Sequence, residues 1–193
     1  MQDNEFIRGP VPMTKSEVRA VSLAKLALFM GAVFWDVGAG TGSISIEAAR
    51  WFAMMKGEES CVYAIEKDEK AIALLKQNRE RLVPEVEKFY IIEGRAPDVL
   101  KALPAPTHVL IGGSGGELEA VVDLVFAKNP KARIVINSIT AETLFRCIQL
   151  CQSRSLASYE IIQMAVTRLE AVGPYHMHKA MNPVYIALLE GQG

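Results

Sequence analysis

The chain has 193 residues, half of them apolar, which is enough for one domain with a buried core and short for two. The net charge of −1, from 21 basic and 22 acidic residues, gives no reason to expect a nucleic-acid or membrane-surface partner. Because the three cysteines lack framework or zinc spacing, and no signal-peptide pattern or membrane-length apolar run occurs, we expect a cytoplasmic protein.

The amino-terminal region is expected to be an arm followed by a helix. Residues 1–13 contain one glycine and two prolines and show no periodicity, so they predict an extended arm. Thr14 and Glu17 have the spacing of a capping box, which predicts a helix that runs to about Phe29. The apolar side chains of the arm either contact another copy of the chain or fold back on their own domain.

Residues 34–47 predict a strand, a tight turn and a helix. An apolar run ends at Gly38, Gly40 and Gly42, and apolar residues then resume at helical spacing. Glycine at every second position lets the backbone turn sharply and approach a ligand that a β-carbon would exclude. The amino terminus of the following helix faces the same ligand.

Similar strand and helix units follow along the chain. Strands are expected at residues 61–65, 89–92, 107–111 and 133–136, with helices capped by Asp68 and Thr140 and another at 117–128. The last two apolar runs, 159–172 and 183–189, are joined by a polar loop without a helix, so they predict an antiparallel pair. The predicted fold is α/β and Rossmann-like, a mostly parallel seven-stranded sheet with helices on both faces, forming one domain over residues 1–193.

In such a sheet, ligands bind at the carboxyl ends of the strands, which gather residues 38–42, Glu66, 94–96, 112–116 and Asn137. The dinucleotide fingerprint is only partly matched, because Ser43 stands where its third glycine would fall. The turn therefore favours S-adenosylmethionine, and Glu66 can accept hydrogen bonds from two ribose hydroxyls.

Each of these features also has a plainer interpretation. Glu66 could be a solvated acid at a strand end. Asp36 either accepts hydrogen bonds from turn amides or organises the amino-acid end of the cofactor. The run 112–116, with four glycines, is either a flexible loop or a close backbone approach to a ligand.

Five blocks in the chain carry a resemblance to one family, at residues 13–19, 35–43, 93–97, 111–116 and 182–186. The glycine turn with Glu66 resembles class I S-adenosylmethionine-dependent methyltransferases. More finely, the blocks resemble the decarboxylating precorrin-6Y or cobalt-precorrin carbon-15 methyltransferases of cobalamin (vitamin B12) biosynthesis. That resemblance implies methylation of carbon-15 of the macrocycle and loss of carbon dioxide from the acetate on ring C.

The resemblance also implies roles for individual residues. It assigns S-adenosylmethionine contacts, with Ala96 near the adenine, to Thr14, Gly38, Ala39, Gly40, Thr41, Gly42, Glu66 and Ala96. It places against the tetrapyrrole Gly113, Ser114, Gly115, Gly116 and Asn137. It further implies a homo-oligomer, specifically a tetramer, and a separate protein that methylates carbon-5.

A substrate with many carboxylates needs cationic or hydrogen-bonding side chains around it. Our best candidate is Arg168, which could also be a solvated strand arginine, and Tyr175 is a further one. His176 and His178 have no nearby carboxylate or cysteine to complete a ligand set, so no metal is expected. Methyl transfer from a sulfonium needs no catalytic nucleophile, and we assign none.

Three alternatives remain open at this point. The same glycine turn and strand-end acid suit a nicotinamide-dependent oxidoreductase. A class I methyltransferase acting on RNA or on another small metabolite is a second alternative, although the near-neutral charge disfavours RNA. A non-catalytic subunit that binds the cofactor only to stabilise an assembly is the third.

Overall fold

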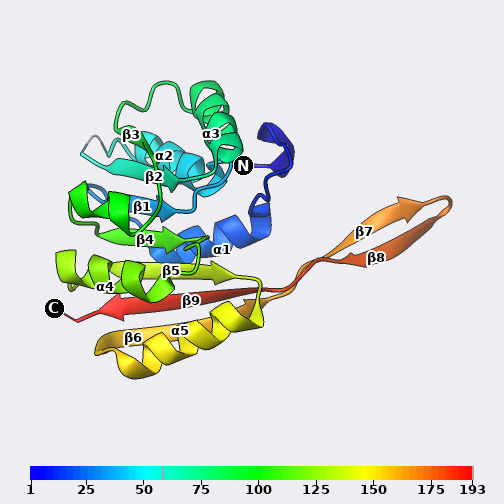
Figure 1. Cartoon of the computed structure of the whole chain (residues 1–193). Coiled ribbons are helices and arrows are strands. Elements are labelled where there is room, and N and C mark those ends of the chain that lie inside the picture. The colour runs from blue at the N-terminus through cyan, green and yellow to red at the C-terminus, as the bar shows by residue number, and fades with distance from the viewer. Residues whose placement is uncertain (58, 193) are drawn as a thin grey trace.

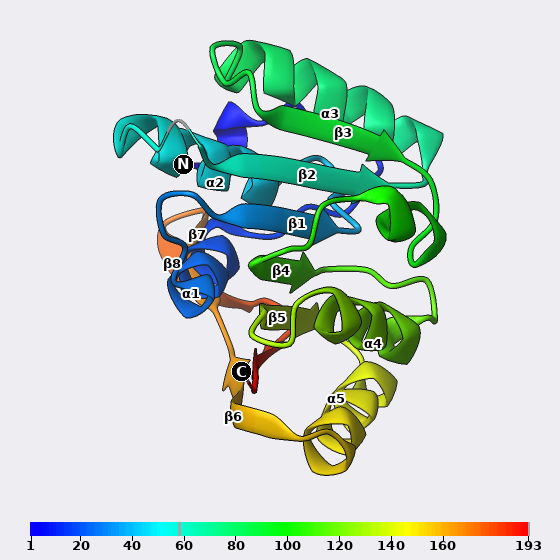
Figure 2. The ribbon, with the colours of Figure 1, turned by 90° about the vertical axis from the view of Figure 1, so that its left-hand side faces the viewer.

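A computed structural model describes residues 1–57 and 59–192 and contains a seven-stranded sheet covered by helices (Figure 1). The strand order is β3-β2-β1-β4-β5-β9-β6, and Figure 2 shows the first five of these one below another. The first five are parallel to one another, and β9 pairs antiparallel with both β5 and β6. The predicted fold class is confirmed. The strands of this sheet are β1 (Val33–Val37), β2 (Cys61–Glu66), β3 (Phe89–Glu93), β4 (His108–Ile111), β5 (Arg133–Ser138), β6 (Leu156–Met164) and β9 (Val184–Gly191).

Two apolar cores lie on the two faces of this sheet. Successive side chains of a strand point to opposite faces, so Phe34 enters one core and Trp35 the other. The first core is covered by α1 (Ser16–Leu26), α2 (Ser43–Met54) and α3 (Glu69–Leu82). The second is covered by η2 (Asp98–Ala102), α4 (Leu118–Lys128) and α5 (Ala141–Ser153). Because both faces are buried, the central strands read as continuous apolar runs.

The starts of α3 and α5 agree with the sequence prediction, because each has a side-chain cap from a nearby residue. The Asp68 carboxylate accepts from the amide of Ala71, and the Thr140 hydroxyl accepts from the amide of Thr143. The capping box predicted at Thr14 is wrong. Helix α1 begins at Ser16 without a side-chain cap, because the Glu17 carboxylate is bound by Arg168 instead.

The amino-terminal arm folds back on its own domain. It contains a short 3₁₀ helix, η1 (Asp3–Glu5), so it is not extended throughout. Phe6 is buried in the first core, and the backbone of Ile7 exchanges hydrogen bonds with the buried Asn78 amide of α3. The end of the arm, at Pro12 and Met13, then reaches the carboxyl ends of the strands.

The carboxy-terminal region departs from the prediction. The apolar run 159–172 is divided between β6 and β7 (Thr167–Val172), and the expected loop contains β8 (Tyr175–Ala180). β7 and β8 form a separate antiparallel hairpin that projects from the body of the molecule (Figure 1). Both strands alternate polar and apolar residues over a few positions, but neither face of the hairpin is buried.

Candidate functional site

A cavity of about 700 Å³ lies at the carboxyl ends of β1, β4 and β5. It brings together many of the residues that the sequence singled out, and the arm and the segments next to β9 complete its wall. The predicted residues that line it are Thr14, Gly38, Ala39, Gly40, Thr41, Gly113, Ser114, Gly115, Gly116, Asn137 and Arg168. Those that do not line it are Asp36, Gly42, Glu66, Ala96 and Tyr175.

The glycines of the turn after β1 are required mainly by protein neighbours. Gly38 has φ of +76°, and a β-carbon there would lie 2.6 Å from the carbonyl oxygen of Gly113. At Gly42 a β-carbon would lie 2.1 Å from Leu75 of α3. The two glycine loops therefore pack backbone against backbone, and this close fit shapes the floor of the cavity.

Glu66, at the end of β2, is held beside the turn by backbone amides. Its Oε2 accepts from the amide of Gly40 at 2.9 Å, and its Oε1 accepts from those of Lys67 and Asp68 at 2.8 and 3.0 Å. Each carboxylate oxygen has two lone pairs, so Oε2 retains one for a further donor. The carboxylate is thus fixed next to the cavity with hydrogen-bonding capacity remaining.

Asp36 is buried beneath the turn. It accepts hydrogen bonds from the amide of Ser45 at 3.1 Å and from the Ser45 hydroxyl, both in the first turn of α2. Burial raises the pKa of Asp36 to about 6, although the bonds from Ser45 oppose this shift. The structure thus shows Asp36 hydrogen-bonded to the first turn of α2, and Asp36 does not line the cavity.

Two other predicted residues lie outside the cavity. Ala96 is buried in the second core, next to the carboxyl end of β3. Tyr175 is 73% exposed and pairs with Val172 at the tip of the projecting hairpin. Within one copy of the chain, the structure does not bring Tyr175 to the cavity.

Arg168 lines the cavity but is engaged by acidic residues. Its Nη2 lies 2.8 Å from each carboxylate oxygen of Glu17 and 3.6 Å from Asp3. Arg19 is fully buried, where it donates to Asp3, to Glu47 and to the carbonyl of Thr14 at 2.7 Å. These two arginines fix the arm at the cavity wall, since Thr14 itself lines the cavity.

Two further arginines hold the glycine loop after β4. Arg95 Nη2 donates to the carbonyl of Gly115 at 3.3 Å, and Arg146 Nη2 donates to that of Gly116 at 2.8 Å. Arg146 also donates through Nε to Glu119 of α4 at 2.9 Å. The loop is thus gripped from both sides, which limits the freedom that its glycines would otherwise give it.

The corner between β5 and α5 carries a polar group that was not predicted from the sequence. Besides the predicted Asn137, this corner places Ser138, Thr140, Thr143 and Arg146 on the cavity wall. Thr143 and Arg146 are three residues apart and share one face of α5, and Thr140 caps this helix three residues before Thr143. Polar residues at this spacing, directly after a predicted strand end, were the sequence signal from which this part of the cavity wall could have been predicted. Two hydroxyls on the wall, Thr41 Oγ1 and Ser138 Oγ, are buried without a hydrogen-bond partner among the described residues.

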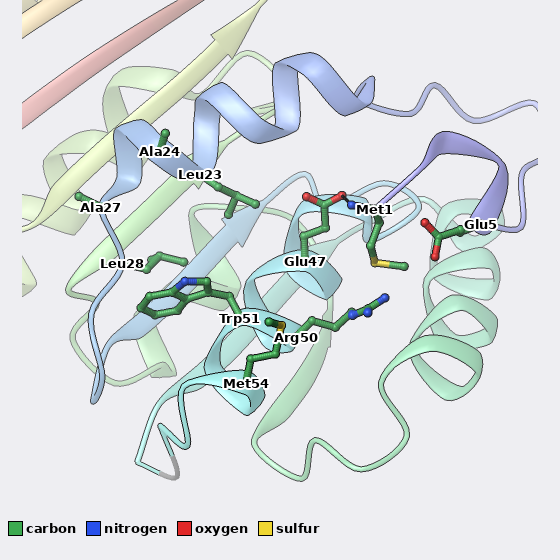
Figure 3. A pocket seen from close by; sticks show the side chains of 10 residues that line it. All are labelled: Met1, Glu5, Leu23, Ala24, Ala27, Leu28, Glu47, Arg50, Trp51 and Met54. Atoms are coloured by element: carbon green, nitrogen blue, oxygen red, sulfur yellow. Dashed lines mark ion pairs between the residues drawn. The ribbon is translucent and has the colours of Figure 1, made fainter.

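A second hollow of about 560 Å³ lies between α1, α2 and the amino terminus (Figure 3). Figure 3 shows Glu47 on α2 pointing toward Met1, with whose amino group it forms an ion pair of 3.1 Å. Its wall is mostly apolar and includes Leu23, Leu28 and Trp51. It shares no lining residue with the larger cavity, so it is a separate feature.

None of the described helices is long and apolar enough to cross a membrane. Within residues 1–57 and 59–192, no three histidine, cysteine or acidic side chains cluster as a metal-binding group.

Comparison with known proteins identifies the family. A family model described as a precorrin methyltransferase domain matches residues 7–189. A relative from Pyrobaculum calidifontis is 41% identical over 176 residues, which are 91% of this chain and 87% of the relative. The cobalt-precorrin-6B C(15)-methyltransferase (decarboxylating) of Salmonella typhimurium is 36% identical over 188 residues, covering 96% of this chain and 93% of that protein.

A solved structure agrees with these relatives. The precorrin-6Y C5,15-methyltransferase from Geobacter metallireducens superposes with a TM-score of 0.88 at 32% identity. The match covers 98% of this chain and 97% of the solved chain, so it includes the sheet, the helices and the projecting hairpin. These similarities favour a methyltransferase over the nicotinamide-dependent oxidoreductase that the glycine turn alone leaves open.

Proposed function

The chain belongs to the precorrin methyltransferase family, and from this premise we propose that it methylates carbon-15 of a precorrin or cobalt-precorrin and removes carbon dioxide from the ring C acetate. One observation carries the proposal. A single cavity at the carboxyl ends of the strands combines a glycine turn beside a fixed acid with a second wall rich in hydroxyl, amide and guanidinium groups. Such a cavity can hold a methyl donor and a polar acceptor together.

The residues present fit S-adenosylmethionine as the methyl donor. Glu66 has lone pairs left for the ribose hydroxyls, and it lies against the same turn that would receive the rest of the cofactor. Thr41 Oγ1 is buried on the wall without a partner among the described residues, as expected of a hydroxyl that a ligand satisfies. Ala96 is proposed to flank the adenine, and Thr14 to close the site from the arm.

The opposite wall is proposed to receive the tetrapyrrole. Gly113, Ser114, Gly115 and Gly116 present backbone and a hydroxyl rather than bulky side chains, which suits a flat macrocycle. Asn137 is held in place by Ser22 of α1, whose Oγ accepts from its amide nitrogen at 2.9 Å. Lys15 lines the cavity and forms no ion pair with any described residue, so its ammonium is available for a substrate carboxylate.

Alignment of donor and acceptor is the main contribution of the protein to catalysis. S-adenosylmethionine supplies, when bound, a methyl group that is already activated by the sulfonium. The turn 38–41 and Glu66 would fix the donor, while residues 113–116 and Asn137 would fix the acceptor carbon in line with it. The macrocycle is its own electron sink, because its conjugated imines accept the electron pair that the departing carbon dioxide leaves. Apolar wall residues such as Met164 and Met181 would exclude water.

We also propose that the chain is a cytoplasmic, single-domain protein that assembles as a homo-oligomer, specifically a tetramer. The hairpin β7–β8 supports this assembly, since two strands without a core to pack on are marginally stable in water. Its exposed apolar side chains, Leu169, Val172 and Met177, would be covered by a second copy. Arg168 and Tyr175 are retained as substrate-positioning candidates, and carbon-5 methylation is assigned to a separate protein.

Calorimetry with S-adenosylhomocysteine tests the cofactor assignment. We expect the wild-type chain to bind it and NAD to give no signal. Glu66→Ala should weaken binding by at least about tenfold, because charge-assisted hydrogen bonds to the ribose are lost. Glu69→Ala removes an exposed acid from the first turn of α3 and is the matched control.

Two results would overturn this assignment. Tight NAD binding without any response to S-adenosylhomocysteine would restore the oxidoreductase. Full turnover by Glu66→Ala alongside a partner protein, despite lost cofactor binding, would instead favour a non-catalytic subunit.

A further inference from the structure

We propose that the corner between β5 and α5 is a binding subsite for a carboxylate side chain of the substrate that is retained during the reaction. The subsite consists of Ser138, Thr143 and Arg146. The inference rests on the proposed function, because it assigns the recognition of a polycarboxylate macrocycle to named residues in the same cavity. It adds a specificity-determining role that does not follow from the glycine turn or from Glu66.

Ser138 places a buried hydroxyl on the wall of the cavity. It is the last residue of β5, its side chain lines the cavity, and it is only 7% exposed. Its Oγ has no hydrogen-bond partner among the described residues. A buried hydroxyl without a partner costs free energy, so its placement on a cavity wall points to a ligand atom that completes its hydrogen bonding.

The guanidinium group of Arg146 is held by the protein on one side only. Glu119 holds its Nε and the carbonyl of Gly116 holds its Nη2, so the guanidinium plane is fixed before any ligand arrives. Within the described part of the chain, Nη1 donates to no residue, and the side chain lines the cavity. A guanidinium with one edge fixed and the other free is suited to a planar carboxylate.

The amino terminus of α5 adds to the same subsite. This helix has 13 residues and begins next to Ser138, with Thr140 as its cap. Thr143 lies one turn into the helix on the same face as Arg146, and its hydroxyl accepts from that of Thr140 at 3.0 Å. The Thr143 hydroxyl proton can then point toward a ligand. The partial positive charge of the helix terminus favours an anion there.

The chemistry indicates which carboxylate the subsite takes. When a carboxylate leaves as carbon dioxide, its negative charge moves into the macrocycle in the transition state. A guanidinium bound to that carboxylate would stabilise the ground state more than the transition state and would slow the reaction. Arg146 therefore suits a carboxylate that stays on the substrate, and its contribution should appear in substrate binding rather than in the chemical step.

The test compares two arginines that both bridge α5 and α4. Arg146 pairs with Glu119 and lines the cavity, whereas Arg154, at the end of α5, pairs with Asp123 and does not. We expect Arg146→Gln to raise the KM for the tetrapyrrole by about tenfold to a hundredfold with kcat little changed. It should also flatten the dependence of KM on salt concentration. Arg146→Lys should recover part of the affinity, and Ser138→Ala should raise KM a few-fold.

Controls separate binding from folding and from failure of the proposed function. Arg154→Gln should leave KM unchanged, and Arg154→Gln and Ser138→Ala should bind S-adenosylhomocysteine like the wild type. The Kd of the tetrapyrrole, measured from its absorbance without a methyl donor, should follow KM. Equal KM and Kd values in Arg146→Gln and Arg154→Gln would overturn the subsite. If Arg146→Gln does not fold, the KM of Ser138→Ala is the test, and an unchanged KM in that variant would overturn the subsite. A wild type that neither binds nor methylates the tetrapyrrole would refute the proposed function instead.

Discussion

Asp36 is a buried acid at the end of β1, next to the glycine turn, and its protonation is expected to make stability depend on pH. Burial raises its pKa from 3.8 to about 6, while its two hydrogen bonds from Ser45 tie β1 to the first turn of α2. In the folded protein the group therefore holds a proton that the unfolded chain releases at lower pH. Ionisation of Asp36 is expected to destabilise the fold because it places a charge in a buried site, although the ionised carboxylate accepts the two hydrogen bonds from Ser45 more strongly.

The replacement Asp36→Asn tests this coupling. Between about pH 4 and about pH 6 the native state binds more protons than the unfolded state, so wild-type stability falls as pH rises. Relative to the variant, we predict a loss of about 3 kcal/mol over this window and a constant difference above it. Urea denaturation at several pH values measures the difference in unfolding free energy between the wild type and Asp36→Asn. Asp98→Asn, which removes the charge of an exposed carboxylate, is the control. A difference that is constant across the window would contradict the raised pKa.

At the scale of elements, the two glycine loops after β1 and β4 act as one unit. Gly38 and Gly113 touch through their backbones, and the amides of Gly112 and Gly113 both donate to the carbonyl of Val37, at 2.9 and 3.2 Å. The loop expected to hold the cofactor and the loop expected to face the substrate are thus in direct contact. Displacement of one should disturb the other.

Gly38→Ala measures this contact against a matched control. Gly31→Ala also introduces a side chain at positive φ, but no atom lies within 4 Å of its β-carbon. Gly31→Ala should lower the free energy of unfolding by about 1 kcal/mol, because of backbone strain alone. Gly38→Ala should cost more than about 2 kcal/mol, since its β-carbon overlaps Gly113. It should also weaken S-adenosylhomocysteine binding. Equal losses in the two variants would show that the contact is unimportant.

Predictability from sequence differed between elements for physical reasons. Asp68 and Thr140 were recognised as caps because each bond closes within three residues. The box at Thr14 failed because Glu17 binds Arg168, which is 151 residues away. Arg146 was missed because its importance depends on Glu119 and Gly116, which lie on other segments. Local signals were therefore readable, whereas competition between distant partners was not.

At the scale of the whole molecule, the hairpin β7–β8 is the feature that a single copy explains least. Its two arms are closed at the base by the amide of Met181 donating to the carbonyl of Val166 at 2.9 Å, and Arg168 pairs there with Glu17 of α1. Beyond that base its side chains are exposed. Because Arg168 also lines the cavity, the proposed assembly would place a subunit contact next to the site.

Lysine substitutions on the hairpin β7–β8 test the proposed assembly. The double variant Leu169→Lys with Met177→Lys should sediment as a smaller species than the wild type, because lysine at a subunit contact must be desolvated. Met30→Lys with Met54→Lys changes two similarly exposed apolar residues on the body and is the control. Dissociation of the control alone would move the subunit contact to the hollow between α1 and α2, which Met54 lines.

Product analysis in a single turnover is the most direct test of the proposed function. The wild-type chain is mixed with S-adenosylmethionine carrying a labelled methyl group and with late precorrin intermediates, with and without cobalt. Labelled methyl in the product and released carbon dioxide are then counted together. We predict equal amounts of both from at least one intermediate, and none of either when S-adenosylhomocysteine replaces the methyl donor. Methyl transfer without carbon dioxide release, or neither with every intermediate, would contradict a decarboxylating carbon-15 methyltransferase.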